Sequence, residues 1–162
     1  METALRPFAA THDAAEARSF FGCHIWVKAT GEQTGGTLAL IDQIVPPGAG
    51  SPWHLHRNED ESFYVIEGEI LFIVGEDQHR ITAGPGTFVF GPRGIPHGFR
   101  NAGPTPARML LEVTPAGFER FALALATPSP DSGAAPAGPP DMEEVMAEAA
   151  KYNVEILGPL PE

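Results

Sequence analysis

The chain has 162 residues, which is enough for one domain with a buried core. Its formal charge is −11 with only 10 lysines and arginines, which argues against binding to nucleic acid or to an anionic membrane surface, because both need clustered positive side chains. The sequence contains neither an apolar stretch of the roughly 20 residues that span a bilayer nor a basic and then apolar leader. The single cysteine, Cys23, cannot form an internal disulfide. We therefore expect a cytoplasmic protein that binds neither membranes nor nucleic acid.

The first two thirds of the chain predict an all-β domain. Residues 1–20 are expected to form an N-terminal arm, and short β-favouring runs separated by glycine and proline turns follow. These runs are residues 23–28, 37–45, 62–67, 69–74, 79–82, 87–90, 97–101 and 107–114. Gly68 is predicted to form a tight turn between antiparallel strands. Many short strands with frequent turns favour an antiparallel sandwich or barrel over residues 21–115.

The pattern changes after Pro115, and residues 116–162 predict a short C-terminal helical extension. Apolar residues recur at helical spacing between residues 117 and 126. A linker or mobile loop is expected over residues 127–140, which are rich in proline, alanine and glycine. Asp141 can cap a second helix, and residues 154–157 are expected to add an edge strand. The apolar face predicted to dock this second helix consists of Met142, Val145, Met146 and Ala149.

Three histidines and a carboxylate predict a metal site. His54 and His56 are two residues apart, so they share a face only in an extended segment, with α-carbons about 6.5–7 Å apart. A run of three carboxylates, residues 59–61, follows them, and His97 comes 36 residues after Glu61. Three imidazoles and one carboxylate suit a first-row transition metal and leave positions for water or substrate. The alternative is exposed loop histidines without a metal. The combination of His54, His56, Glu61 and His97 argues against that alternative.

The spacing around these residues resembles the two motifs of the cupin superfamily. Four residues separate His56 from Glu61, and six separate Glu61 from Gly68. The second motif is matched at every position, by Gly86, Pro92, Gly94, His97 and Asn101. The resemblance implies a jelly-roll barrel and one divalent metal, Fe, Ni, Mn, Cu or Zn, held by His54, His56, Glu61 and His97. It selects Glu61 as the ligand, which leaves Glu59 and Asp60 as loop residues in water, and it implies a homodimer.

Strand parity extends the expected site beyond the metal ligands. Phe63 and Val65 share the parity of Glu61, and Phe99 shares that of His97, so these three side chains are expected inside the barrel. They act there either as core filling or as the wall of a substrate pocket. Arg93 and Arg100 are expected at the solvated surface, where an anionic substrate is the less favoured alternative.

The function expected from this site is that of a metal-dependent dioxygenase acting on a small oxygenated compound, of aromatic or flavonol-like type. Residues 117–154 look like single-domain cupins labelled quercetin dioxygenase-like, which points the same way. In this interpretation Glu61 is the catalytic base, and a redox-active metal is required because Zn would not support the reaction. A non-oxidative metal-dependent isomerase or hydrolase is one alternative. A cupin that binds a small molecule without turnover is another.

Overall fold

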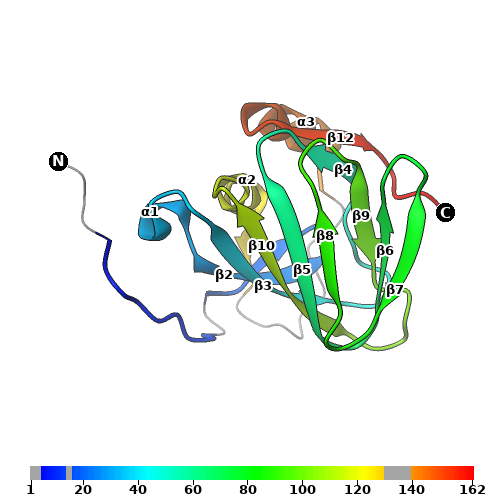
Figure 1. The fold of residues 1–162 in the computed structure, drawn as a ribbon, viewed down its shortest axis with the longest axis horizontal. Coiled ribbons are helices and arrows are strands. Elements are labelled where there is room, and N and C mark those ends of the chain that lie inside the picture. Colours follow the sequence, from blue (N-terminus) through cyan, green and yellow to red (C-terminus); the bar gives the residue numbers. More distant parts are fainter. Residues whose placement is uncertain (1–4, 14–15, 130–139) are drawn as a thin grey trace.

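The computed structural model describes residues 5–13, 16–129 and 140–162. Two antiparallel sheets enclose the core in a jelly roll (Figure 1). In order across the seven-stranded sheet, the strands are β11 (Thr127–Pro128), β1 (Arg18–Phe20), β2 (Cys23–Ala29), β3 (Ala39–Val45), β10 (Ala107–Thr114), β5 (Asp60–Glu67) and β8 (Phe88–Gly91). The five-stranded sheet is formed in order by β12 (Val154–Gly158), β4 (Trp53–His56), β9 (His97–Arg100), β6 (Ile70–Val74) and β7 (His79–Ala83). The expected all-β jelly roll with a C-terminal helical extension is thus confirmed.

The core follows from the alternation of side chains along the strands. In β10 every second residue from Ala107 to Val113 is buried, and the residues between them are only partly buried. Met109 and Leu111 of this strand belong to the same buried core as Phe72 of β6, which comes from the opposite sheet. Burial of each large apolar side chain contributes about 1.5–3 kcal/mol, so the facing strands stabilise each other.

The turn at Gly68 differs from the sequence prediction. The strands on either side, β5 and β6, do not pair, because β5 belongs to the seven-stranded sheet and β6 to the five-stranded one. Gly68 has a φ of 74° and carries the chain from one sheet to the other. A Cβ at this position would lie 2.8 Å from the α-carbon of Ala107, so only glycine lets the chain cross there without a clash.

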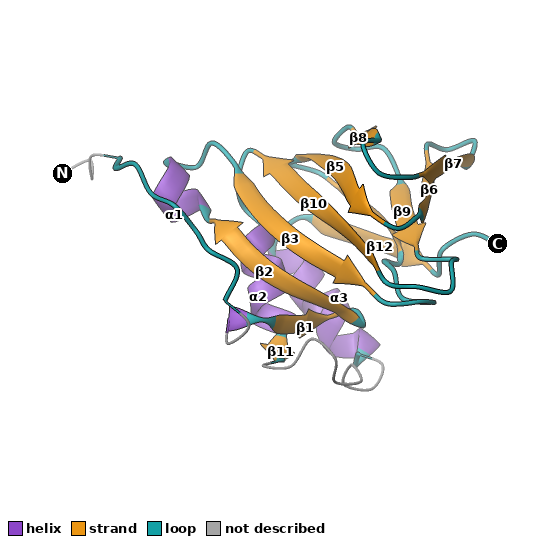
Figure 2. Ribbon diagram, turned by 90° about the horizontal axis from the view of Figure 1, so that it is seen from below, coloured by secondary structure: helices purple, strands orange, loops and turns teal. Residues whose placement is uncertain are grey.

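The C-terminal elements close one end of the sandwich. Helices α2 (Phe118–Leu125) and α3 (Met142–Lys151) lie on one side of the seven-stranded sheet, beside β12 (Figure 2). The expected edge strand is present as β12, which pairs with β4 and sets Val154 opposite His56. The expected cap is also present, since the Asp141 side chain accepts a hydrogen bond from the Glu143 amide.

The docking face of α3 is narrower than predicted. Val145 and Ala149 are buried, but Met142 and Met146 are 45% and 49% exposed. The helical period correctly identifies one apolar stripe, but only Val145 and Ala149 of it belong to the hydrophobic core. Of the expected linker, Thr127 and Pro128 form β11, while residues 130–139 lie outside the described residues.

Several features of the fold have no counterpart in the sequence predictions. Helix α1 (Gly31–Thr34) is a single turn with a capping box between Thr30 and Gln33. The arm is attached to the seven-stranded sheet, because the Trp26 indole donates to the Asp13 carbonyl and Lys28 donates to the Thr11 carbonyl.

Among the described residues, no helix has the length and apolar character to cross a bilayer.

Candidate metal centre

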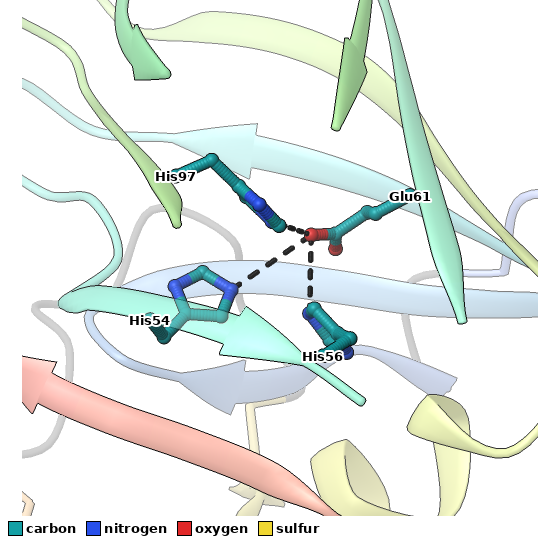
Figure 3. A group of neighbouring side chains, drawn as sticks. All are labelled: His54, His56, Glu61 and His97. Atoms are coloured by element: carbon teal, nitrogen blue, oxygen red, sulfur yellow. Dashed lines mark hydrogen bonds and ion pairs between the residues drawn. The ribbon is translucent and has the colours of Figure 1, made fainter. Parts of the chain in front are cut away.

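Each residue of the predicted metal site lies at the interface between the two sheets. His54 and His56 point to the same face of β4, as their spacing predicts for a strand. His97 opens β9, directly opposite His54 in the pairing of the two strands. Glu61 reaches the same point from β5 of the other sheet (Figure 3). The site therefore exists only because the two sheets pack face to face.

The four side chains form one compact, buried group. The Nε2 atoms of His97, His56 and His54 lie 2.6, 3.2 and 3.8 Å from Glu61 Oε2. One potential ligand atom from each residue lies within 4.8 Å of every other. None of the four residues is more than 6% exposed. A single cation can reach all four side chains from the centre of this group.

Backbone contacts orient two of the histidines toward that centre. His54 Nδ1 lies 2.8 Å from the Pro52 carbonyl, and His97 Nδ1 lies 3.0 Å from the Ile95 carbonyl. A carbonyl only accepts hydrogen bonds, so each Nδ1 carries the proton and donates it. The proton on Nδ1 leaves a lone pair on Nε2, the atom that faces Glu61. Both rings are thereby arranged as metal ligands by contacts outside the group itself.

Charge is distributed unevenly within the group in the absence of a metal. Burial lowers the pKa of His54 to about 4. For His56, burial acts in the same direction, but the charge of Glu61 and the contact with Glu59 outweigh it and raise the pKa to about 9. Burial opposes ionisation of Glu61, yet the charge of His56 and the close approach of the three histidine rings outweigh it and hold the pKa of Glu61 well below its usual value. The metal-free group therefore combines an ionised Glu61 with a protonated His56, and a cation would take the place of the His56 proton.

Buried polar atoms without a hydrogen-bond partner, in and beside the group of four ligands, are consistent with a bound metal. Both ring nitrogens of His56 and Glu59 Oε2 are buried without a hydrogen-bond partner among the described residues. Leaving a buried polar atom without a hydrogen-bond partner costs about 1–3 kcal/mol. A cation bound at His56 Nε2 would remove that cost for the Nε2 atom. Nitrogen and carboxylate oxygen together suit a divalent first-row metal. The residues that would hold it are His54, His56, Glu61 and His97.

An apolar pocket leads to this group. Its cavity volume is about 40 Å³, and its lining is mostly apolar. His54 and Glu61 contribute to the lining, and Gln43 and Ser51 add two further polar side chains. The aromatic part of the lining consists of Phe20, Phe21, Phe99, Phe118 and Phe121. The pocket thus has polar side chains beside the ligand group and a remainder lined by phenylalanine and aliphatic side chains.

The three residues predicted to lie beside the metal do not behave alike. Phe99 lines the pocket, as the alternative that it forms part of a substrate-pocket wall requires. Phe63 and Val65 are 1% and 0% exposed and lie in the hydrophobic core outside the lining of this pocket. Phe63 packs at 4.9 Å on Phe72, ring centre to ring centre, so it fills the space between the sheets. Strand parity indicates the inner face of a strand but not how far along that face a pocket extends.

Most of the aromatic lining was absent from the sequence predictions. Phe118 and Phe121 were recognised there only as the apolar face of a helix, because helical spacing does not show what a helix covers. Phe20 and Phe21 lie at the β1–β2 turn, which is outside the strand runs predicted from the sequence. The Phe121 ring lies 5.8 Å from the Phe20 ring, which brings the helix and the turn to the same part of the pocket.

The prediction that Glu59 lies in water is wrong. Glu59 is only 3% exposed, and its Oε2 lies 3.5 Å from Nδ1 of His56. Asp60, in contrast, points outward and forms a two-pronged hydrogen bond with Arg93. Residues 59 and 60 are adjacent in the chain but face opposite directions, and the strand parity that Glu59 shares with Glu61 was the sequence signal for this.

Comparisons with known proteins agree with this architecture. Residues 41–113 match the family model described as Cupin domain. The tetracenomycin polyketide synthase protein TcmJ of Streptomyces glaucescens is 30% identical over 87 residues, which cover 53% of this chain and 57% of that protein. The dimethylsulfoniopropionate lyase DddQ of Ruegeria pomeroyi is 33% identical over 81 residues, covering 49% of this chain and 39% of that protein. The chain thus spans about half the length of the curated relatives it matches.

A solved structure shares the fold at low sequence identity. A predicted oxalate decarboxylase from Thermotoga maritima superposes with a TM-score of 0.60 at 17% identity, covering 66% of this chain and 98% of that one. At this identity the likeness concerns the fold alone. Residues 41–113 thus match a cupin-domain family model, and they lie within a jelly-roll fold that the Thermotoga protein shares.

Proposed function

We propose that this protein is a metal-dependent enzyme acting on a small, largely apolar compound that carries neighbouring oxygen donors. The observation that supports this most directly is that His54 and Glu61 line the same pocket as five phenylalanines. Apolar walls with a few convergent polar groups are typical of small-molecule sites. An aromatic or aliphatic body would pack against the phenylalanines while its oxygen atoms face the four ligands.

The reaction we propose is oxidation of this compound by O₂, that is, a dioxygenase reaction. When bound, a redox-active divalent metal would polarise the substrate oxygens and supply the electron-transfer chemistry. Glu61 belongs both to the ligand group and to the pocket lining, so its carboxylate is placed to accept the hydroxyl proton of a bound enol or phenol. The phenylalanines exclude water from the same space.

A second candidate is a non-oxidative reaction at the same residues. The relationship with TcmJ, which is described as a polyketide synthase protein, favours a polyketide-like substrate with carbonyl and hydroxyl groups close together. Such a substrate needs only proton transfer by Glu61 and Lewis-acid assistance in order to enolise or isomerise. Oxygen consumption distinguishes the two candidates.

The test uses protein stripped of metal and reloaded separately with Fe(II), Mn(II), Ni(II), Cu(II) or Zn(II). Each form is incubated with flavonols, catechols and 1,3-diketones, in air and under nitrogen, while an oxygen electrode and mass spectrometry follow O₂ and products. Oxygen uptake with a redox-active metal and none with Zn(II) would support the dioxygenase. Turnover under nitrogen would support the second candidate, and tight binding without turnover would reduce the function to ligand binding. Failure of every metal to bind would refute the proposal.

We also propose that the protein is a homodimer, as the cupin resemblance implies. The chain has a mass of 17.2 kDa, so light scattering coupled to size-exclusion chromatography should give twice that value. A single species of monomer mass at micromolar concentration would contradict this assembly.

A further inference from the structure

The three histidines of the metal centre differ in what their outer nitrogen faces. For His54 and His97 that nitrogen, Nδ1, lies within hydrogen-bond distance of a backbone carbonyl. For His56 it faces a carboxylate oxygen, Glu59 Oε2, at 3.5 Å. His56 is therefore the one of these three ligands whose outer neighbour is a charged side chain.

Both atoms of this contact are buried and otherwise unpaired. His56 is 0% exposed and Glu59 3%. Among the described residues, neither His56 Nδ1 nor Glu59 Oε2 has a hydrogen-bond partner. An N–H···O bond is usually about 2.9–3.0 Å long, so a shift of about half an ångström would join the two atoms and satisfy both. Burying a carboxylate without a partner is unfavourable, which makes this pairing the simplest explanation for the position of Glu59.

The surroundings leave room for the Glu59 side chain to turn inward. Glu59 lies in the loop between β4 and β5, so it is close in the chain to both His56 and Glu61. A Cβ at Gly117 would lie 2.7 Å from Glu59 Oε1, which means that any other residue there would press on the carboxylate. The neighbouring Asp60 shows the alternative, since its carboxylate points outward to Arg93.

We propose that Glu59 is a positioning residue that accepts a hydrogen bond from His56 Nδ1 and thereby orients His56 and strengthens it as a metal ligand. A carboxylate behind a ligating imidazole fixes the ring and raises its basicity, and loss of such a partner typically weakens metal binding by about 10–100-fold. This inference rests on the proposed metal centre.

The test compares Glu59→Ala and Glu59→Gln with Asp60→Asn. The last variant removes the same charge one residue away, from a side chain that contacts Arg93 instead of His56. Affinity for Mn(II) and Co(II) is measured by competition with a chelator. Glu59→Ala should weaken binding by about 10–100-fold. Glu59→Gln should recover part of the affinity because its amide oxygen still accepts a hydrogen bond, and Asp60→Asn should bind as the wild type does.

Proton NMR of the Co(II) form supplies a reading that a loss of packing alone would not give. Exchangeable, paramagnetically shifted ring N–H signals are expected from the three histidines. In Glu59→Ala one of them should move or broaden through exchange with water, while the other two remain. If Glu59→Ala does not fold, Glu59→Gln alone decides, through its affinity and the shift of the same signal.

The outcomes separate this inference from the function on which it rests. If the wild-type protein binds neither metal, both the metal centre and the role of Glu59 are refuted. If the wild type binds metal and the Glu59 variants match it in affinity and in all three signals, only the role of Glu59 is refuted. An equal loss in Asp60→Asn would also overturn it, because the effect would then come from overall charge.

Discussion

Replacing Glu61 by glutamine is the sharpest perturbation of the metal centre, because it removes the charge and keeps the shape. Glu61 is 1% exposed, and its Oε2 lies 2.6–3.8 Å from the Nε2 atoms of His54, His56 and His97. Removing one partner of a buried, hydrogen-bonded charge pair typically costs about 3–5 kcal/mol. Since each 1.4 kcal/mol is tenfold in affinity, the Kd for a divalent metal should rise by about 100- to 3,000-fold.

Thermal unfolding gives a direct measure of this change. At a metal concentration of 100 times the Kd, binding adds about 2.7 kcal/mol to the free energy of unfolding. For a chain of this size each kcal/mol raises the Tm by about 2–4 °C, so wild-type protein should gain about 5–11 °C from metal. If its Kd is 100-fold higher, Glu61→Gln at the same concentration should gain only about 1–2 °C.

The control is Glu67→Gln, which removes a charge from the exposed end of the same strand. It should retain the whole metal-dependent rise in Tm. The reasoning would be refuted if Glu61→Gln bound metal with wild-type affinity, or if chelator-treated wild-type protein showed no rise in Tm on adding Mn(II), Fe(II), Ni(II) or Zn(II).

Three further predictions concern the rest of the molecule. Burial raises the pKa of the Cys23 thiol to about 12. A thiol reagent should therefore label the native protein far more slowly than the urea-unfolded chain, whereas equal labelling rates would show that Cys23 is accessible. Burial would raise the pKa of Asp42, but its hydrogen bonds and charge interaction with Arg108 outweigh it and lower the pKa. A lowered native pKa contributes stability that is present above the unfolded value of about 3.9 and lost as the pH falls through the native pKa. Urea titrations should show this loss below about pH 4, and Arg108→Met should flatten it; an unchanged slope would contradict the pairing. Finally, Phe121→Ala should lower the free energy of unfolding by about 3–5 kcal/mol in urea titrations, since Phe121 is 2% exposed, and it should widen the pocket. A loss of less than about 1 kcal/mol would show that helix α2 is loosely packed.

The local parts of the metal centre could be predicted because they depend on short-range geometry. His54 and His56 share a face in any extended segment, and their spacing excludes a helix. The turn after β9 is held by equally local contacts, since Asn101 accepts a hydrogen bond from the Gly103 amide and donates to the Thr105 carbonyl. Such features involve only residues a few positions apart.

The position of Glu59 could not be predicted, because it depends on contacts between distant segments. In the sequence, strand parity groups Glu59 with Glu61 and separates both from Asp60, but it does not show which side chain each carboxylate meets. Their environments differ because His56 lies behind Glu59 and Arg93 lies outside Asp60. Gly117, more than fifty residues away, leaves the space that Glu59 occupies.

The sequence by itself determined the strand-rich domain, the four candidate ligands and the apolar stripes of both C-terminal helices, because side-chain alternation and turn chemistry act over a few residues. Only the tertiary structure decided that β5 and β6 belong to different sheets, that Phe99 lines the pocket while Phe63 fills the core, and that Phe118 and Phe121 form part of the pocket wall. The physical reason is that burial is a property of packed surfaces. A residue becomes core, pocket or solvent-exposed according to which distant segment covers it, and local periodicity does not specify that segment.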